Sequence, residues 1–136
     1  MQPVDQTRFG DPDGNCLAAC VASIFEVALE DVADFQASNW LIELNEWLAP
    51  RGLAHLCLSF RHGLDSTLMP GGFHLIGGPS RRGHNHSVVG HTGVIVHDPH
   101  PDRSGLERII DYGFFIALRP ETLRAEEKVK PPWRTS

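Results

Sequence analysis

Residues 13–25 read DGNCLAACVASIF, and the rest of the chain is organised around this stretch. Its large apolar side chains recur with the 3.6-residue period of an α-helix, with small alanines between them. Glycine punctuates the approach to this run, and Asp13 or Asn15 can cap its first turn. The pattern therefore predicts a helix that begins at Cys16.

Two cysteines lie one turn apart on this predicted helix. Cys16 falls in the first turn, where the partial positive charge of the free backbone N–H groups favours thiolate over thiol. This position is typical of a nucleophile. Cys20 lies further in on the same face, and we interpret it as a small buried apolar side chain.

Length and composition define the broad class of protein. The 136 residues, 41% hydrophobic and 21% charged, predict one soluble globular domain over 1–136. The net charge of −5, without a basic stripe, argues against a nucleic-acid partner. No apolar run approaches the roughly 18 residues of a membrane span, and the first residues lack the pattern of a signal peptide. We therefore expect a cytoplasmic protein with no membrane partner, and its oligomeric state is left open.

The elements around the first helix follow from turn residues and apolar spacing. Residues 1–15 read as an irregular arm, and 29–35 as a linking turn. A second helix is expected from Ser38, as its cap, to Leu48. Its core face carries Trp40, Leu41, Leu44, Trp47 and Leu48.

Beyond the second helix the apolar runs become short and are bounded by turns, which is typical of strands. Cys57 falls in the first of these runs and is expected to be buried. A loop is expected over 61–72 and a flexible charged tail over 121–136. The expected strands lie within 56–60, 73–77, 86–90, 94–98 and 111–118. The order predicts an α+β fold, in which N-terminal helices pack on an antiparallel sheet of about five strands.

A hairpin over residues 86–98 brings a histidine and an acid together. If a three-residue connection joins its strands, His86 lies opposite Asp98, with Cβ atoms about 4.5–5.5 Å apart. A two-residue connection would instead favour His97 as the partner. With the first register, Cys16, His86 and Asp98 form the nucleophile, base and orienting acid of nucleophilic catalysis.

These residues resemble the papain-like cysteine peptidases, in their small bacterial and phage-type variants. The order Cys16, His86, Asp98 and the succession of helices and sheet carry the resemblance, which spans roughly residues 6–118. It implies a cysteine peptidase or amidase that works through an acyl-enzyme, without a cofactor, on a peptide or amide substrate. The context of Cys16 departs from the Cys-Gly-Ser-Cys-Trp type of the larger enzymes.

The same resemblance implies a glutamine that donates to the oxyanion hole. Gln6 is the natural candidate, although it lies farther upstream of the cysteine than is usual, and residues 11–14 read as an insertion that absorbs the difference. Gln2 and Asn15 are the alternatives.

Two further groups of polar residues surround the predicted triad. Arg81, Arg82 and His84 lie on a loop before His86 and are candidate substrate contacts, for example to a carboxylate; His74 is expected at the same rim. A zinc site is the rival interpretation of His84, His86, His91, His97 and His100, but their spacing lacks the usual ligand pairs, so no metal is expected.

Two other functions are compatible with the same residues. An acyltransferase would use the same triad. A catalytically idle domain of the same shape would serve as a binding module.

Overall fold

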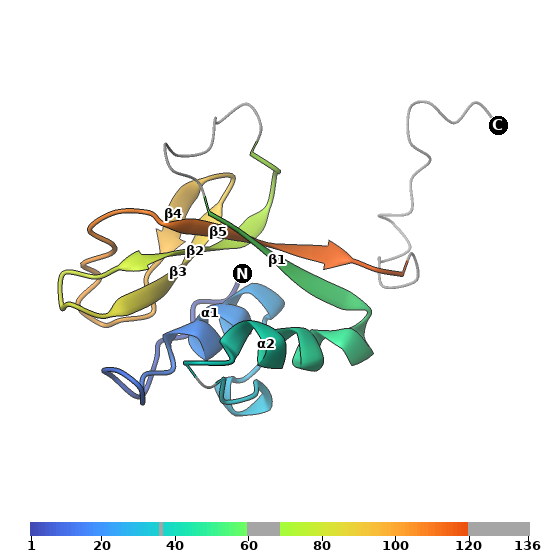
Figure 1. Ribbon diagram of the computed structural model, residues 1–136, viewed down its shortest axis with the longest axis horizontal. Coiled ribbons are helices and arrows are strands. Elements are labelled where there is room, and N and C mark those ends of the chain that lie inside the picture. The colour runs from blue at the N-terminus through green and yellow to red at the C-terminus, as the bar shows by residue number, and fades with distance from the viewer. Residues whose placement is uncertain (36, 60–68, 120–136) are drawn as a thin grey trace.

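The computed structural model describes residues 1–35, 37–59 and 69–119, and it places two α-helices on one side of a five-stranded sheet (Figure 1). Helix α1 spans Cys16–Phe25 and helix α2 spans Trp40–Leu48. Two short 3₁₀ helices, η1 (Leu29–Asp31) and η2 (Ala49–Arg51), follow them. The predicted α+β fold and the predicted start of the first helix at Cys16 are confirmed.

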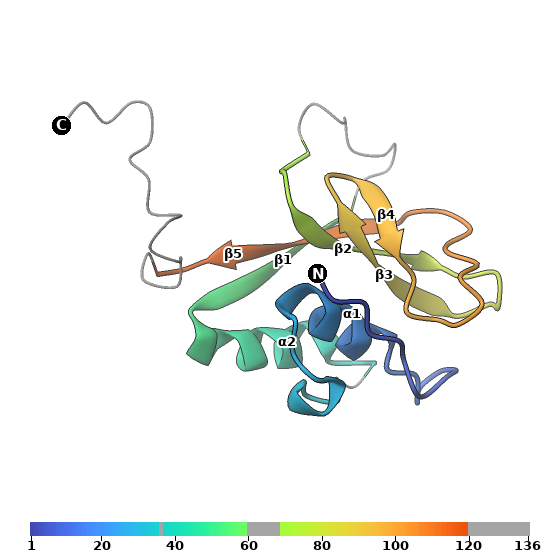
Figure 2. The same ribbon diagram turned by 180° about the vertical axis from the view of Figure 1, so that it is seen from behind.

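The last strand in the sequence lies in the interior of the sheet. The strands are β1 (Leu53–Ser59), β2 (Phe73–Pro79), β3 (Asn85–His91), β4 (Val94–His97) and β5 (Asp111–Ala117). Their order is β1-β5-β2-β3-β4, and each neighbouring pair is antiparallel. Strand β5 therefore joins β1 to β2, as the view from behind also shows (Figure 2). The last strand of the sequence and two strands from its middle therefore meet on this part of the sheet.

The main core fills the space between the helices and the sheet. Helix α1 packs mainly on β3, and α2 packs on β1. Fully buried Leu44 and Leu48 contribute about 1.5–3 kcal/mol each by leaving water. The buried apolar cluster consists of Ala18, Cys20, Val21, Ala22, Val32, Phe35, Leu44, Leu48, Leu75 and Val89. The prediction that Cys20 is buried is thus confirmed.

The second helix differs in detail from its prediction. Its N-cap is Asn39 rather than Ser38, because the helical turn starts one residue later. Leu41 is 36% exposed, so it lies at the margin of the core face rather than within it. Trp47 is half-buried, and its indole N–H donates to the carbonyl oxygen of Asp31.

The N-terminal arm connects helix α1 to the loop that follows β4. Ser23 in α1 accepts from the N–H of Val4 through its hydroxyl, at 2.9 Å. On the other side, His97 donates its Nε2 hydrogen to the carbonyl oxygen of Val4 at 2.8 Å, and Gln6 N–H donates to Pro99. The arm consequently holds the start of the helix and the end of β4 in one arrangement.

The turn between β3 and β4 corrects the predicted register. His91 pairs with Val94, so the connection has two residues rather than three. A bulge between Val89 and Gly90 then shifts the pairing, and Val89 faces His97. The predicted three-residue turn, which would place His86 opposite Asp98 in the strand register, is therefore wrong. The two side chains nevertheless form a hydrogen bond, because Asp98 lies in the loop after β4.

His74 is buried and supports the same turn, so its expected place at the rim of the site is wrong. It is 1% exposed, donates from Nδ1 to the carbonyl oxygen of Leu75 and accepts the N–H of Gly93 on Nε2 at 2.9 Å. The absence of a side chain at Gly90 leaves room for the ring, since a Cβ there would lie 2.6 Å from its Cε1. His74 is a structural residue.

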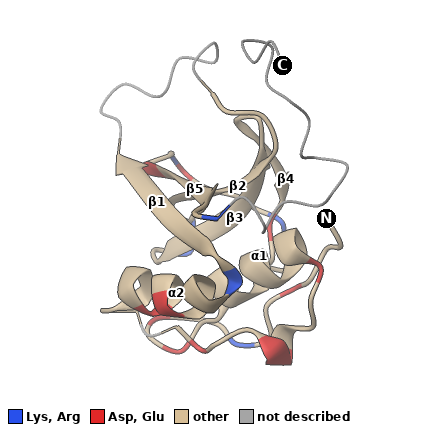
Figure 3. Ribbon diagram, turned by 90° about the vertical axis from the view of Figure 1, so that its right-hand side faces the viewer, with Lys and Arg blue, Asp and Glu red and all other residues tan. Residues whose placement is uncertain are grey.

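Charged residues are distributed unevenly over the described chain. In Figure 3 many Asp and Glu residues lie in the helical layer, whereas Arg residues are scattered over separate elements. None of the helices in the described ranges is both long and apolar enough to span a bilayer. Most of the expected 61–72 loop and the whole expected 121–136 tail lie outside the described residues.

Candidate functional site

A cavity of about 530 Å³ opens beside the first turn of α1. Cys16 lies in its wall together with His86 and Gln6, which come from β3 and the N-terminal arm. The wall continues along β2 to β1 and β5, where it includes Cys57 and Asp111. Three candidate residues that are far apart in the sequence thus share one cavity.

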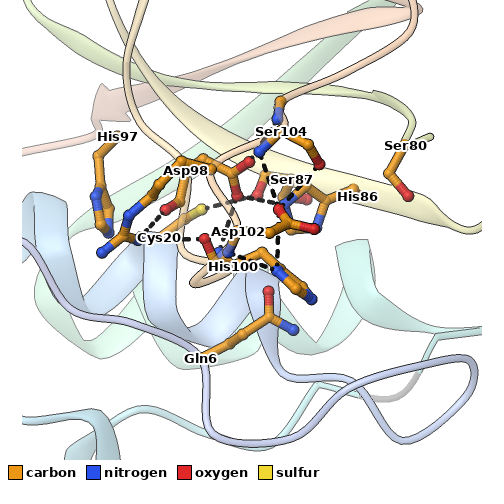
Figure 4. A network of polar contacts seen from close by, with 12 residues as sticks. Gln6, Cys20, Ser80, His86, Ser87, His97, Asp98, His100, Asp102 and Ser104 are labelled. Atoms are coloured by element: carbon orange, nitrogen blue, oxygen red, sulfur yellow. Dashed lines mark hydrogen bonds and ion pairs between the residues drawn. The ribbon is translucent and has the colours of Figure 1, made fainter. Parts of the chain in front are cut away.

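His86 and Asp98 form a buried pair. The Nε2 hydrogen of His86 is donated to Oδ1 of Asp98 at 2.7 Å, and each residue is 6% exposed. Figure 4 shows the two side chains meeting where β3 begins and the loop after β4 passes. Because Nε2 carries the proton in this bond, Nδ1 of the neutral ring retains its lone pair. This tautomer is the one that a general base requires.

Asp98 is held by its own loop rather than by strand pairing. Besides His86, it accepts the N–H of His100 on Oδ1 at 2.9 Å and the N–H of Gly105 on Oδ2 at 2.7 Å. Arg103 donates to the carbonyl oxygen of Asp98 and forms a two-pronged ion pair with Asp5 of the arm. Burial acts to raise the pKa of Asp98, but the hydrogen bonds outweigh it and hold the pKa below its ordinary value.

Cys16 experiences opposing influences. Burial raises the pKa of its thiol and is the largest effect, whereas hydrogen bonding from the backbone N–H groups of Ser87, Leu17 and Cys16 itself lowers it. Burial prevails, so the free site holds a thiol at neutral pH. The helix start alone predicts a preference for thiolate, but burial of Cys16 reverses this preference.

Burial also sets the protonation state of His86. It lowers the pKa of the imidazole more than the hydrogen bond and charge of Asp98 raise it. Burial therefore favours the uncharged forms of both groups, a thiol at Cys16 and a neutral imidazole at His86.

Gln6 reaches the cavity because residues between it and Cys16 loop out. The N–H of Gly14 donates to the carbonyl oxygen of Gly10 at 2.8 Å, and the N–H of Asn15 donates to Arg8 at 3.3 Å. The sequence separation is thereby absorbed by the turn at 10–14, much as expected. Gly14 is required there, since a Cβ would lie 2.5 Å from the oxygen of Gly10.

The amide of Gln6 is only partly used by the protein. Its Nε2 donates one hydrogen to the carbonyl oxygen of Arg8 at 2.8 Å, while its buried Oε1 has no hydrogen-bond partner among the described residues. In Figure 4 the side chain rises from the arm towards the group around His100. The hydrogen bond to Arg8 uses one of the two amide hydrogens of Gln6 and leaves the second for another acceptor.

Asn15 fixes the arm instead of capping the helix through its side chain. Its Oδ1 accepts the N–H groups of Thr7 and Arg8 at 3.0 and 2.9 Å, and its Nδ2 donates to the hydroxyl of Thr7. It occupies the N-cap position of α1, yet no side-chain cap bond is formed. Asn15 therefore connects Cys16, its neighbour in the chain, to the segment that carries Gln6.

The three candidate substrate contacts have different environments. Arg82 lines the cavity, but its guanidinium is engaged by Asp102 at 2.8 Å and by the hydroxyl of Ser104. His84 also lines the cavity and is exposed, whereas Arg81 is exposed and lies outside the lining. Only His84 of this group is both at the cavity and without a partner assigned to its ring.

His100 lines the cavity, whereas the sequence interpretation considered it as a possible zinc ligand. Its ring centroid lies 6.4 Å from that of His86 and 5.1 Å from that of Phe9. Nδ1 of His100 lies 3.1 Å from both the backbone nitrogen and Oδ1 of Asp102, so Asp102 holds this ring. The run His97-Asp98-Pro99-His100 carried the signal, since a second histidine two residues after the acid stays beside it.

Two of the histidines considered for zinc lie apart from the others. His97 contacts the arm, and His91 interacts with Thr92, away from the buried His86 pair. Among the described residues, no group of three or more His, Cys, Asp or Glu side chains could hold a metal ion.

Cys57 and His55 line the part of the cavity beyond Cys16. Cys57 is half-buried rather than buried, because its side of β1 faces the cavity. His55, two residues earlier, is 7% exposed, and its Nδ1 has no hydrogen-bond partner among the described residues. Burial lowers the pKa of His55 to about 4.

This buried histidine predicts acid sensitivity. Between pH 6.5 and 4 the unfolded chain binds a proton at His55 that the folded protein excludes, so the free energy of unfolding falls as the pH is lowered. The loss from this residue is about 3 kcal/mol across that window. Chemical denaturation at several pH values should show a flatter profile for His55→Phe, whose ring can pack against Trp40 and Phe115 as the imidazole does. Equal slopes in both proteins would exclude this assignment.

Comparison of the chain with protein-family models, with curated proteins and with solved structures yields no match. The class of protein is therefore argued from the site itself.

Proposed function

We propose that the protein is a thiol hydrolase, a cysteine peptidase or amidase of the papain-like kind, which acts on a peptide or amide substrate in the cytoplasm. The buried hydrogen bond from His86 to Asp98, beside a cavity that Cys16 also lines, is the observation that carries the proposal. It provides an oriented base and a nucleophile in the wall of one cavity, which can admit a substrate. The resemblance to papain-like peptidases in residue order supports the same class.

The proposed reaction begins with transfer of the Cys16 proton to Nδ1 of His86. The sulfur bonds to the substrate carbonyl carbon, the C–N bond breaks, and the imidazolium returns the proton to the departing amine. His86 then removes a proton from water, which attacks the thioester and releases the acid and the free thiol. Asp98 keeps the ring in the required tautomer and stabilises its charged form.

The oxyanion that forms during attack needs hydrogen-bond donors. The backbone N–H of Cys16 and the second amide hydrogen of Gln6 are the proposed donors, since both residues line the cavity. Removing one such donor costs about 10²–10³-fold in rate in comparable hydrolases. Gln6 is therefore proposed to stabilise the oxyanion, whereas Cys16, His86 and Asp98 carry out the reaction.

Selective alkylation tests the nucleophile. Brief treatment with iodoacetamide near neutral pH should label Cys16 faster than Cys57 and Cys20. Backbone N–H groups at the start of α1 act to lower the pKa of Cys16, whereas the charge of Asp111 acts to raise the pKa of Cys57, and Cys20 is fully buried. Peptide mapping by mass spectrometry measures the three rates. Faster labelling of the half-buried Cys57 would contradict the assignment.

The pH dependence of this labelling tests the protonation state. Since burial raises the pKa of Cys16, its labelling rate should continue to rise through the alkaline range. A thiolate–imidazolium pair would give instead a rate that is nearly constant from mildly acidic to neutral pH. An idle binding domain predicts no difference between Cys16 and Cys57 at any pH, and an acyltransferase predicts an acyl-enzyme that amines release faster than water.

Replacing the proposed base should affect only one of the cysteines. His86→Ala is expected to slow labelling of Cys16 on the order of 10²-fold near neutral pH, because the proton acceptor is lost, while Cys57 keeps its rate. His97→Ala is the matched control: it removes the hydrogen bond to Val4 and should lower the melting temperature with little change in Cys16 labelling. If His97→Ala slowed Cys16 labelling more than His86→Ala, His97 rather than His86 would be the base.

A further inference from the structure

The end of the cavity away from α1 is built from three strands. His55 and Cys57 lie on β1, Asp111 and Gly113 on β5, and Gly77 on β2, and all five line the cavity. The register pairs Cys57 with Gly113 and Gly77 with Asp111, so these residues are neighbours across adjacent strands. None of them has a role in the proposed reaction.

Two glycines leave space for the polar groups at this end. A Cβ at Gly77 would collide with the carboxylate of Asp111, and a Cβ at Gly113 would collide with the ring of His55. Both polar side chains therefore lie directly over the backbone of a neighbouring strand. Larger residues at these positions would fill the space that the carboxylate and the imidazole occupy.

Asp111 is a half-buried acid that lacks a cation. Throughout the described ranges, no Lys, Arg or His forms an ion pair with it; the ion pairs of the structure involve other acids. Burial raises the pKa of Asp111, and its charge contributes, after burial, to raising the pKa of Cys57. An uncompensated carboxylate in a cavity wall is costly unless a bound cation pairs with it.

His55 provides a second unpaired group, and it is neutral. More than nine-tenths of the residue is buried, and Nδ1 has no partner among the described residues. Trp40 and Phe115 flank its ring, with centroids 6.1 and 4.8 Å away. Trp40 and Asp111 line this end of the cavity together with His55, and an aromatic face and a carboxylate both favour a cation over an anion.

We propose that this end of the cavity, formed by Asp111, His55 and the glycines at 77 and 113, is a subsite that binds a cationic group of the substrate, such as a lysine or arginine side chain. The proposal rests on the proposed function, because the same cavity then holds the scissile bond at Cys16. It names the substrate class as a basic peptide or a cationic amide. Arg82 does not neutralise the site, since Asp102 and Ser104 engage it.

Charged alkylating probes test the subsite in the working enzyme. A series of iodoacetamides carrying aminoalkyl chains of increasing length is compared with hydroxyalkyl reagents of equal length. The best aminoalkyl reagent should label Cys16 at least about 10-fold faster than its neutral counterpart, which corresponds to about 1.4 kcal/mol. Guanidinoalkyl reagents distinguish recognition of arginine-like from lysine-like groups.

Asp111→Asn should abolish this preference, so that cationic and neutral reagents of equal length label Cys16 at equal rates. Asp31→Asn removes the same charge from an exposed position outside the cavity and should retain the preference. Equal rates for cationic and neutral reagents at every length, or a preference that survives in Asp111→Asn, would overturn the subsite.

A binding measurement separates failure of the subsite from failure of the proposed reaction. In Cys16→Ser protein, which cannot be alkylated at that position, calorimetric titration with an alkylguanidine and an alkylamine should show binding that Asp111→Asn weakens at least about 10-fold. Binding without Cys16 reactivity in the natural protein would preserve the subsite and reject the hydrolase. If neither compound bound while Cys16 was still labelled selectively, the subsite would be rejected and the hydrolase would be preserved.

Discussion

Asp98→Asn is expected to slow acylation of Cys16 by an activated ester on the order of 10²–10⁴-fold. If the amide oxygen faces His86, the tautomer survives but the negative charge that stabilises the imidazolium is lost. If the amide nitrogen faces His86 instead, the ring is driven to the tautomer with its proton on Nδ1, which cannot act as the base. Stopped-flow measurement of the ester reaction gives the rate for each protein.

The same change should also destabilise the fold. Asp98 accepts three hydrogen bonds through two oxygens, whereas an amide has one acceptor oxygen, so an N–H of the loop is left unpaired. The expected loss is about 1–3 kcal/mol in the free energy of unfolding.

Asp102→Asn is the matched control for this pair of effects. Asp102 lies in the same loop as Asp98 and accepts from Ser104 and from Arg82, which precedes β3, but its bonds do not involve His86. Its replacement should change stability while leaving acylation of Cys16 within a few-fold of the natural rate. If both variants lowered the melting temperature and neither slowed acylation, Asp98 would be a loop residue without a part in catalysis.

Asn15→Ala is expected to produce the second large effect, a loss of about 2–4 kcal/mol in the free energy of unfolding. The backbone N–H groups of Thr7 and Arg8 both donate to Oδ1 of Asn15, which is only 7% exposed, and each would be left without its acceptor. The segment that carries Gln6 would then separate from the start of α1. Urea denaturation measures the stability.

Asn15→Asp tests whether the loss of stability comes from the hydrogen bonds that Oδ1 of Asn15 accepts. A carboxylate oxygen can accept both N–H groups, the hydroxyl of Thr7 can donate to it, and negative charge is favourable at a helix N-terminus. This variant should therefore keep most of the stability. Equal losses in the two variants would show that the acceptor oxygen is not what holds the arm.

The sequence predicted the parts of this protein that depend on neighbouring residues. The apolar period and the glycine before it indicated a helix that starts at Cys16, and short bounded runs indicated the strands. The contact of His86 with Asp98 was anticipated, since hairpin strands that are close in the sequence tend to pair. Its register was wrong because the bulge at Val89 and Gly90, together with the ring of His74, determines the turn.

Properties that depend on distant segments were decided only by the tertiary structure. A helix start favours thiolate, but enclosure of Cys16 by the sheet and the arm raises its pKa instead. Likewise, no local pattern indicates that β5 lies between β1 and β2, and only this order brings Asp111 and His55 into the same cavity as Cys16. Period and turn residues encode local conformation, whereas burial and the meeting of remote side chains depend on how complete elements pack.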